Sequence, residues 1–269
     1  MILRPVSLSY FAPAHAASSI IRGQNFTVEC ITGADGADNI IHSDHETILL
    51  IPESEATLTM DSETMEIGSR SIAVVPAGAF QLQLPRGARA FALTTARRDM
   101  DPRNVVNADD YKVLDGRVIP VAKPMVRSEN DADRIRVYQV DDIPFPEGNP
   151  RLKFFQSSTM SINWVEYEGQ RDRTKLSPHA HEDFEQGSLA IAGDFVHHIR
   201  TPWVSNAEEW REDQHIEASA GSMAIIPPEL IHTTEGVGPG RHILIDVFAP
   251  PRADFIAKGW VFNAGDYQA

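Results

Sequence analysis

The chain has 269 residues and a formal net charge of −14 at pH 7, with 24 Lys and Arg against 38 Asp and Glu. This acidity, without a basic cluster, excludes nucleic acid as a partner, because an acidic surface repels the phosphate backbone. The hydrophobic content of 42% and the charged content of 23% are typical of a folded globular protein, of one domain or two.

Strands are predicted along the whole chain. Short apolar runs recur about every ten residues, and Gly, Pro, Asp and Asn separate them, which favours an all-β sandwich or barrel. The clearest runs are residues 46–51, 71–76, 134–140, 222–228 and 242–248. Helical periodicity is confined to short segments near 205–212 and 252–258.

The N-terminal segment, the lengths of the apolar runs and the single cysteine indicate the cellular compartment. No apolar run approaches the roughly 18–20 residues that span a bilayer, so no membrane partner is expected. Residues 1–19 loosely imitate a secretion signal, but Ser, Tyr and Pro interrupt the apolar stretch, and we interpret them as mature chain. Cys30 has no partner for an intrachain disulfide. We expect a cytoplasmic protein.

The sequence repeats itself. Residues 105–111 (VVNADDY) match 261–267 (VFNAGDY), and the spacing Gly68…Pro76…Gln81 parallels Gly221…Pro227…His232. Because the matches keep their order, we predict two homologous β-domains, residues 1–125 and 126–269. Seven of the ten histidines and all four tryptophans lie in the second domain, so the chemistry is expected there.

A metal site is predicted in the second domain. His179 and His181 are two apart, so in an extended segment their imidazoles share a face, and Glu185 and His232 follow at compatible spacing. Three imidazoles and one oxygen suit one divalent transition metal per chain (Mn, Fe, Ni, Co or Zn) and leave positions open for substrate. Gln186 is the alternative oxygen ligand; it would leave the ion more positive and favour Lewis-acid over redox chemistry.

These residues resemble the two motifs of the cupin superfamily, G-x5-H-x-H-x3-4-E-x6-G and G-x5-P-x-G-x2-H-x3-N. Glu229 stands where the second motif has glycine, and Gly236 stands where it has asparagine. The resemblance implies a bicupin, that is, two jelly-roll barrels in tandem. The chain reads His179-x-His181-x3-Glu185 and Gly221-x5-Pro227-x-Glu229-x2-His232.

The first domain lacks most of this site. Its position equivalent to His179 is Ile40, which cannot bind a metal, so we expect a degenerate barrel without metal that is structural or mediates dimerisation. A homodimer is expected, because exposed barrel edges pair between chains. Through the repeat, the four ligand positions His179, His181, Glu185 and His232 fall at Ile40, His42, Glu46 and Gln81.

A second group of candidate residues lies on the run from residue 244 to 252. Asp246 is a candidate general acid or base, Phe248 shares its face, and Arg252 could bind a substrate carboxylate bidentately. The run resembles small cupins that linearise unsaturated uronates in pectin and alginate breakdown, which implies active-site roles for these three residues. The alternative is a closing strand with one buried, paired aspartate.

Three further candidates follow in the second domain. One of His197 and His198 must face inward by strand alternation, and we favour His198, together with Arg200, as a substrate contact. Trp203 lies in an insertion, residues 201–215, where it could stack on a sugar ring from a lid, or serve as a core or dimer contact.

Three functions fit these observations. The preferred one is a metal-dependent enzyme of isomerase or lyase type that acts on a small carboxylated substrate, a sugar acid or keto acid. The alternatives are an iron- or nickel-dependent dioxygenase and a non-enzymatic bicupin that binds a small ligand.

Overall fold

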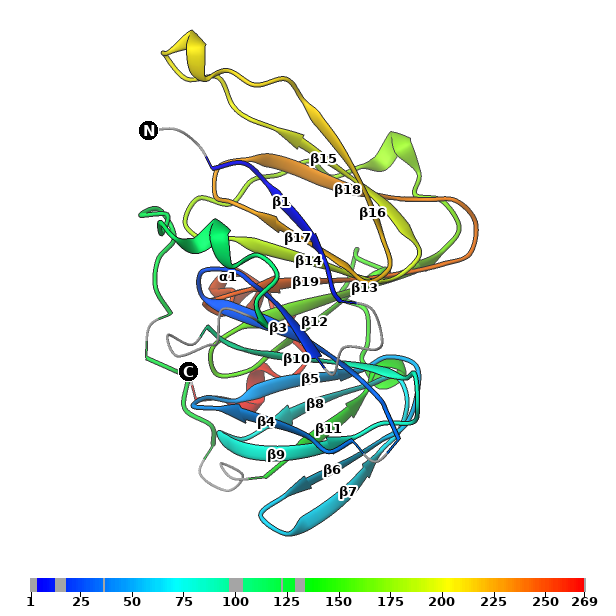
Figure 1. The fold of residues 1–269 in the computed structure, drawn as a ribbon. Coiled ribbons are helices and arrows are strands. Elements are labelled where there is room, and N and C mark those ends of the chain that lie inside the picture. The colour runs from blue at the N-terminus through cyan, green and yellow to red at the C-terminus, as the bar shows by residue number, and fades with distance from the viewer. Residues whose placement is uncertain are drawn as a thin grey trace.

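The computed structural model describes residues 4–12, 18–35, 37–96, 104–121, 123–128 and 134–268. These residues form four antiparallel sheets, together with one short helix, α1 (Ala253–Ala257), and several 3-10 turns (Figure 1). The all-β prediction is confirmed. The helix expected near 252–258 is α1, whereas only a 3-10 turn, Ala207–Glu209, forms in the segment 205–212.

The first barrel is built from a six-stranded and a four-stranded sheet. The larger sheet has the order β11 (Arg136–Gln139), β8 (Ser71–Val75), β5 (Thr47–Ile51), β10 (Arg89–Thr95), β3 (Phe26–Thr32), β2 (Ser18–Arg22). The smaller has the order β4 (Asn39–Ser43), β9 (Gly78–Gln83), β6 (Ala56–Met60), β7 (Glu63–Ile67). Side chains such as Ile31, Leu49, Leu58, Phe80 and Leu82 fill the interior.

The second barrel repeats this plan. Its six-stranded sheet has the order β1 (Ser7–Tyr10), β17 (Ser222–Ile226), β14 (Gln186–Ala192), β19 (Arg241–Phe248), β13 (Ser161–Glu168), β12 (Leu152–Gln156). Its smaller sheet has the order β16 (Gln214–Ser219), β15 (Asp194–Arg200), β18 (Ile231–Val237). Among the described residues, its interior holds two small apolar clusters, one around Phe195 and Leu244 and one around Ile199 and Leu230, and a cavity remains between the sheets.

Each large sheet takes one of its two edge strands from the other half of the sequence. β1, from the N-terminal end, pairs with β17 of the second barrel, and β11 pairs with β8 of the first barrel. A division between residues 125 and 126 therefore does not follow the sheets, because it separates both strands from the barrels they complete. The exchange ties the barrels together through backbone hydrogen bonds.

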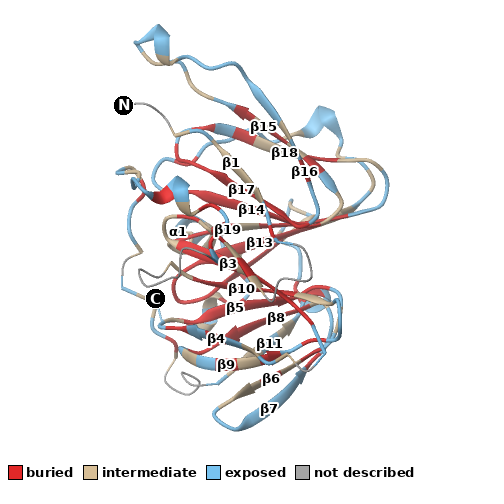
Figure 2. Ribbon diagram, in the orientation of Figure 1, coloured by how far each residue is buried: buried red, intermediate tan, exposed pale blue. Residues whose placement is uncertain are grey.

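The two large sheets pack face to face and form the main core, which Figure 2 shows as the red band across the middle of the molecule. Phe26 and Phe91 come from the first barrel, and Phe155 and Trp164 from the second; all four are at most 1% exposed. The sheets approach so closely at Gly187 that a Cβ there would lie 2.9 Å from Cζ of Phe26 on the opposing sheet, and it would also meet Met223 Cε of the same sheet at 2.3 Å. This close approach favours glycine at the second position of β14.

The sequence repeat is also a structural repeat. Asn107 Oδ1 accepts a hydrogen bond from the backbone N–H of Arg22 (2.9 Å), and its Nδ2 donates to the Arg22 carbonyl (2.8 Å). Asn263 makes the same pair of bonds with Gln156, both at 2.9 Å. Within the described ranges, no helix has the length and apolar character needed to cross a membrane.

Candidate metal centre

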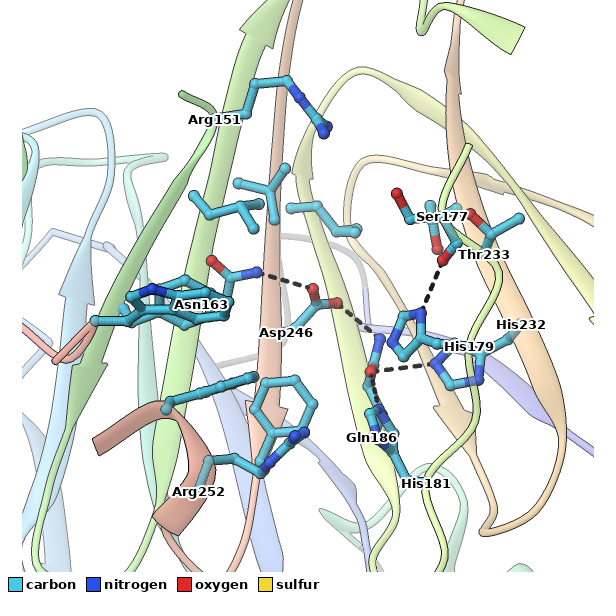
Figure 3. A pocket seen from close by; sticks show the side chains of 18 of the residues that line it. Arg151, Asn163, Ser177, His179, His181, Gln186, His232, Thr233, Asp246 and Arg252 are labelled. Atoms are coloured by element: carbon cyan, nitrogen blue, oxygen red, sulfur yellow. Dashed lines mark hydrogen bonds between the residues drawn. The ribbon is translucent and has the colours of Figure 1, made fainter. Parts of the chain in front are cut away.

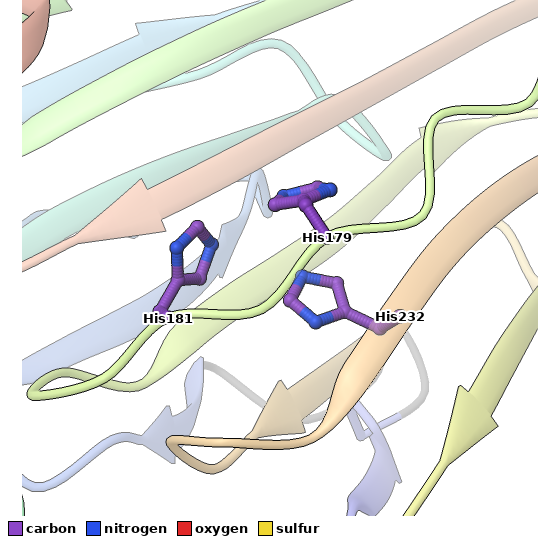
Figure 4. Close-up of side chains that lie close together, drawn as sticks. All are labelled: His179, His181 and His232. Atoms are coloured by element: carbon purple, nitrogen blue, oxygen red, sulfur yellow. The ribbon is translucent and has the colours of Figure 1, made fainter. Parts of the chain in front are cut away.

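Three imidazoles meet inside the second barrel. One ring nitrogen from each of His179, His181 and His232 lies within 4.8 Å of the other two (Figure 4). Backbone hydrogen bonds join His179 N–H to the His232 carbonyl (3.0 Å) and His232 N–H to the His179 carbonyl (2.8 Å). This bridge holds the segment before β14 against β18, so the paired histidines and the later one share a single site.

The hydrogen bonds of the rings fix which nitrogen faces the cluster. Nδ1 of His232 lies 2.9 Å from the Leu230 carbonyl, and Nδ1 of His179 lies 2.9 Å from the Ser177 carbonyl. A carbonyl only accepts, so each Nδ1 donates, and a neutral ring then carries its lone pair on Nε2. Burial lowers the pKa of His232 to about 4 and that of His181 to about 3, which keeps both rings neutral at pH 7.

Gln186 supplies an oxygen at the same point. Its Oε1 lies 2.9 Å from His181 Nε2 and 3.2 Å from His232 Nε2, and its Nε2 donates to Ser188 Oγ and Asp246 Oδ1, each at 3.1 Å (Figure 3). The amide oxygen thus faces an unprotonated nitrogen of His232, and two lone pairs at this distance repel unless a cation lies between them. Three imidazoles and one oxygen fit a divalent transition metal.

Glu185, the preferred oxygen ligand in the sequence interpretation, lies outside this cluster. Its carboxylate accepts hydrogen bonds from the Tyr111 hydroxyl (3.2 Å) and the Gln24 backbone N–H (2.5 Å), and it pairs with Arg4 at 3.3 Å. Neighbouring residues of an extended strand point to opposite faces. Because Gln186 at the start of β14 points into the barrel, Glu185 points out, toward the first barrel.

A cavity of about 320 Å³ opens beside the cluster, between the strands of the two sheets. It brings Asp246, Phe248 and Arg252 together with the three histidines and Gln186. Figure 3 shows Asp246 between Asn163 and Gln186, with Arg252 on the far side of the aromatic rings. The candidates predicted from the run 244–252 therefore share one site with the candidate metal ligands.

Asp246 is held by three neighbours. Its Oδ1 accepts from Ser188 Oγ (2.8 Å) and Gln186 Nε2 (3.1 Å), and its Oδ2 accepts from Asn163 Nδ2 (3.4 Å). Burial raises the pKa of Asp246 to about 6, and the hydrogen bonds oppose the rise. The carboxyl group can therefore hold or release a proton near neutral pH.

Arg252 packs among aromatic rings. Its guanidinium carbon lies 4.1 Å from the centre of the Phe255 ring and 5.3 Å from that of Phe248, and Nε and Nη2 each lie 2.7 Å from a carboxylate oxygen of Asp254. Its third nitrogen, Nη1, is buried and has no hydrogen-bond partner among the described residues. One nitrogen of this cavity-lining arginine thus lacks a hydrogen-bond partner in the described part of the protein.

His198 does not reach the cavity, contrary to the expectation. It bonds to His215, with the two Nδ1 atoms 2.7 Å apart, and to Glu235 Oε2 at 3.0 Å. The inward residue is His197, 1% exposed, because it shares its side of β15 with the core residues Phe195 and Ile199. The apolar neighbours two positions away were the signal in the sequence that could have settled this choice.

Arg200 and Trp203 also lie outside the cavity. Arg200 is 65% exposed and pairs with Asp213, Nη2 to Oδ2 at 2.5 Å. Trp203 is 75% exposed and stacks on Trp210, with ring centres 4.6 Å apart. The hairpin of β15 and β16 carries both residues away from the barrel mouth, so neither touches the candidate site.

Several cavity residues were missed by the sequence interpretation. Asn163 and Ser188 flank Asp246 because β13 and β14 are its two neighbours in the sheet, with Asn163 and Ser188 directly opposite it. No motif marks these residues, since the pairing of β13 with β19 joins distant parts of the chain. The other missed lining residues include Arg151, Leu152, Val165, Tyr167, Arg171, Thr233 and Lys258.

No protein-family model matches the sequence, and the comparison with curated proteins gives no match. Solved structures do match the fold. A formate complex of oxalate decarboxylase from Lactobacillus farciminis is 15% identical with a TM-score of 0.57, over 86% of this chain and 78% of that one. A mutant of Bacillus subtilis oxalate decarboxylase is 13% identical with a TM-score of 0.54, over 84% and 69%.

AerE from Microcystis aeruginosa is 12% identical with a TM-score of 0.52, over 89% of this chain and 98% of that one. At these identities the likeness concerns the fold, and it extends over both barrels. Together with the two jelly-roll barrels, the exchanged edge strands and the repeated Asn-Ala-x-Asp-Tyr segment, it shows that the chain has the bicupin fold.

Proposed function

We propose that the protein is a metal-dependent cupin enzyme of isomerase or lyase type that acts on a small carboxylated substrate, a sugar acid or keto acid. One observation carries the proposal. The histidine cluster, the amide oxygen of Gln186 and the carboxyl group of Asp246 line a single cavity large enough for a small molecule.

The proposed ligands are His179, His181, His232 and Gln186, which would hold one ion of Mn, Fe, Ni, Co or Zn. All four ligands are neutral, so the ion would keep its full positive charge. When bound, such an ion polarises a carbonyl or hydroxyl group as a Lewis acid. A neutral ligand set favours this role over redox chemistry, which is why an isomerase or lyase ranks above a dioxygenase.

Side chains of the protein would transfer the proton, bind the substrate carboxylate and exclude water. Asp246, fixed by Ser188 and Asn163, would take a proton from a substrate carbon or hydroxyl and return it elsewhere. Nη1 of Arg252 would donate to the substrate carboxylate, and Phe248 would cover the reacting end from water. The resemblance to uronate-linearising cupins supports these roles, and the oxalate decarboxylases of similar fold are named for a small dicarboxylate.

The experiment begins with metal content. Protein purified without a histidine tag is expected to carry about one transition-metal ion per chain, and His179→Ala and His232→Ala are expected to lose it. His215→Ala is the matched control, because His215 is exposed and lies on the outer strand β16. Unchanged metal content in the first two variants would overturn the site.

Turnover is then measured by NMR on unsaturated uronates and on keto acids, in air and without oxygen. Isomerisation or elimination at equal rates under both conditions supports the proposal. Oxygen consumption in step with turnover would replace it by a dioxygenase, and tight binding without turnover would replace it by a ligand-binding bicupin. The homodimer and the cytoplasmic location stay predictions, which sedimentation and cell fractionation test.

A further inference from the structure

The cavity has a second cationic end. Arg151 and Arg171 line it together with the metal cluster. Among the residues that the structure describes, neither guanidinium has a carboxylate partner: Arg151 lies 5.9 Å from the centre of the Tyr167 ring, and Arg171 Nη2 donates to the Lys175 carbonyl at 2.7 Å. In a chain of net charge −14, these two arginines differ from Arg252 of the same cavity, which is paired with Asp254.

The sheet register places this end relative to the reacting end. Leu152, Val165 and Leu244 are directly opposite one another on β12, β13 and β19, and all three line the cavity. Two residues further along the same strands, Asn163 stands opposite Asp246. Two residues of a strand advance by about 7 Å, so the row of Leu152, Val165 and Leu244 lies about 7 Å from the row that contains Asp246. This apolar row therefore lies between Asp246 and Arg151, which directly precedes β12.

Figure 3 agrees with this order. Arg151 lies at the top of the view, Asp246 and the histidines in the middle, and Arg252 at the bottom. Unlabelled aliphatic side chains occupy the space between Arg151 and Asp246. A ligand that reaches from the histidine cluster to Arg151 must therefore pack its middle part against apolar side chains.

Arg151 is placed unfavourably in the free protein. Burial, with the nearby positive charge of Arg171, lowers the pKa of Arg151. Each positive charge disfavours the other, and no carboxylate of the described residues pairs with either guanidinium, so a bound anion would relieve the repulsion. A planar carboxylate matches the fork of a guanidinium, which donates through two parallel N–H bonds.

We propose that Arg151 and Arg171 form a second carboxylate-binding subsite, so that the substrate is a dicarboxylic keto acid with an apolar segment between its two ends. The inference rests on the proposed function, and it favours one of the two substrate classes named there, the sugar acids and the keto acids. The row of Leu152, Val165 and Leu244 offers no partner for hydroxyl groups, and burying unpaired hydroxyls is costly, so a keto acid is favoured over a sugar acid.

The experiment compares two six-carbon probes on the metal-loaded protein by calorimetry. 2-Oxoadipate and 2-oxohexanoate share the keto-acid end, and only 2-oxoadipate carries a carboxylate at the other end. We expect 2-oxoadipate to bind at least about tenfold more tightly, the usual effect of one charge-assisted hydrogen bond. Arg151→Met is expected to remove this advantage and to leave the affinity for 2-oxohexanoate unchanged, and Arg171→Met to reduce the advantage.

Arg200→Met is the matched control, because it removes an arginine that lies outside the cavity, and both affinities should stay at wild-type values. Arg151→Lys retains the charge and should keep part of the preference, which separates loss of charge from loss of fold. Equal affinities of the wild type for both acids, or a preference that survives Arg151→Met, would overturn the subsite while the metal centre and turnover stand. Failure of both acids to bind the wild type would overturn the subsite and the keto-acid substrate together.

Discussion

Glu46 and Glu185 occupy equivalent positions in the two barrels, and each accepts a hydrogen bond from the tyrosine that ends a repeated Asn-Ala-x-Asp-Tyr segment. Tyr111 donates to Glu185 at 3.2 Å, and Tyr267 donates to Glu46 at 2.8 Å. Each tyrosine comes from the opposite half of the sequence to its glutamate. Each of the two glutamates therefore links its barrel to the opposite half of the chain. This holds for Glu185, in the barrel with the histidine cluster, and for Glu46, in the barrel without it.

This relationship predicts different outcomes for two adjacent residues. Gln186→Leu removes the oxygen that faces His181 and His232, and we expect metal affinity to fall at least about tenfold. A loss of this size is the smallest usually seen even when the mutated residue only hydrogen-bonds to a metal ligand. Glu185→Gln keeps the size of the side chain and leaves the cluster untouched, so its metal content should equal that of the wild type. Elemental analysis and competition with a chelator measure both. Loss of metal in Glu185→Gln alone would reverse the assignment.

The two tyrosine anchors should contribute similarly to stability. Tyr111→Phe and Tyr267→Phe each leave a buried carboxylate with one donor fewer, and we expect the free energy of unfolding to fall by about 1–3 kcal/mol. Tyr10→Phe is the control, because Tyr10 is 48% exposed and its hydroxyl has only long contacts with Ser219. Denaturant unfolding gives the comparison. Equal stability of all three variants would show that the anchors contribute nothing.

Much of the fold could be predicted because its signals are local or repeated. Apolar runs with turn residues between them predicted the strands, and the spacing of His179, His181 and His232 predicted their meeting in one barrel. The alignment of the halves also agrees with the pairing of strands: Ile40 stands opposite Gln81, as His179 stands opposite His232.

The errors arose where a one-residue shift or a distant partner decides the outcome. The face of Glu185 depends on where β14 begins, and a shift by one residue exchanges it with Gln186. The same ambiguity affected His197 and His198. The exchange of β1 and β11 could not be foreseen, because nothing in these short segments marks a partner more than sixty residues away along the chain.

Asp246→Asn tests the proton transfer separately from metal binding. Asparagine keeps the size of the side chain and can still bond to Ser188 and Gln186, but it cannot take up a proton at neutral pH. We expect kcat to fall by about 10²–10⁴-fold, the usual contribution of a general acid or base, with metal content unchanged. Asp213→Asn, at an exposed pair with Arg200, should retain wild-type turnover. Full turnover of Asp246→Asn would remove this residue from the mechanism.

The first barrel should contribute stability without contributing to chemistry. Leu58 is fully buried in the apolar cluster that fills the interior of the first barrel. Leu58→Ala therefore opens a void there and should lower the free energy of unfolding by about 2–5 kcal/mol. Because Leu58 lies on the small sheet, away from the face that meets the second barrel, metal content and the affinity for 2-oxoadipate should not change below the unfolding temperature. Denaturant unfolding, elemental analysis and calorimetry on the same preparation compare the three quantities. A loss of ligand affinity in the folded variant would show instead that the first barrel helps to shape the site, and that its packing is transmitted through the main core between the two large sheets.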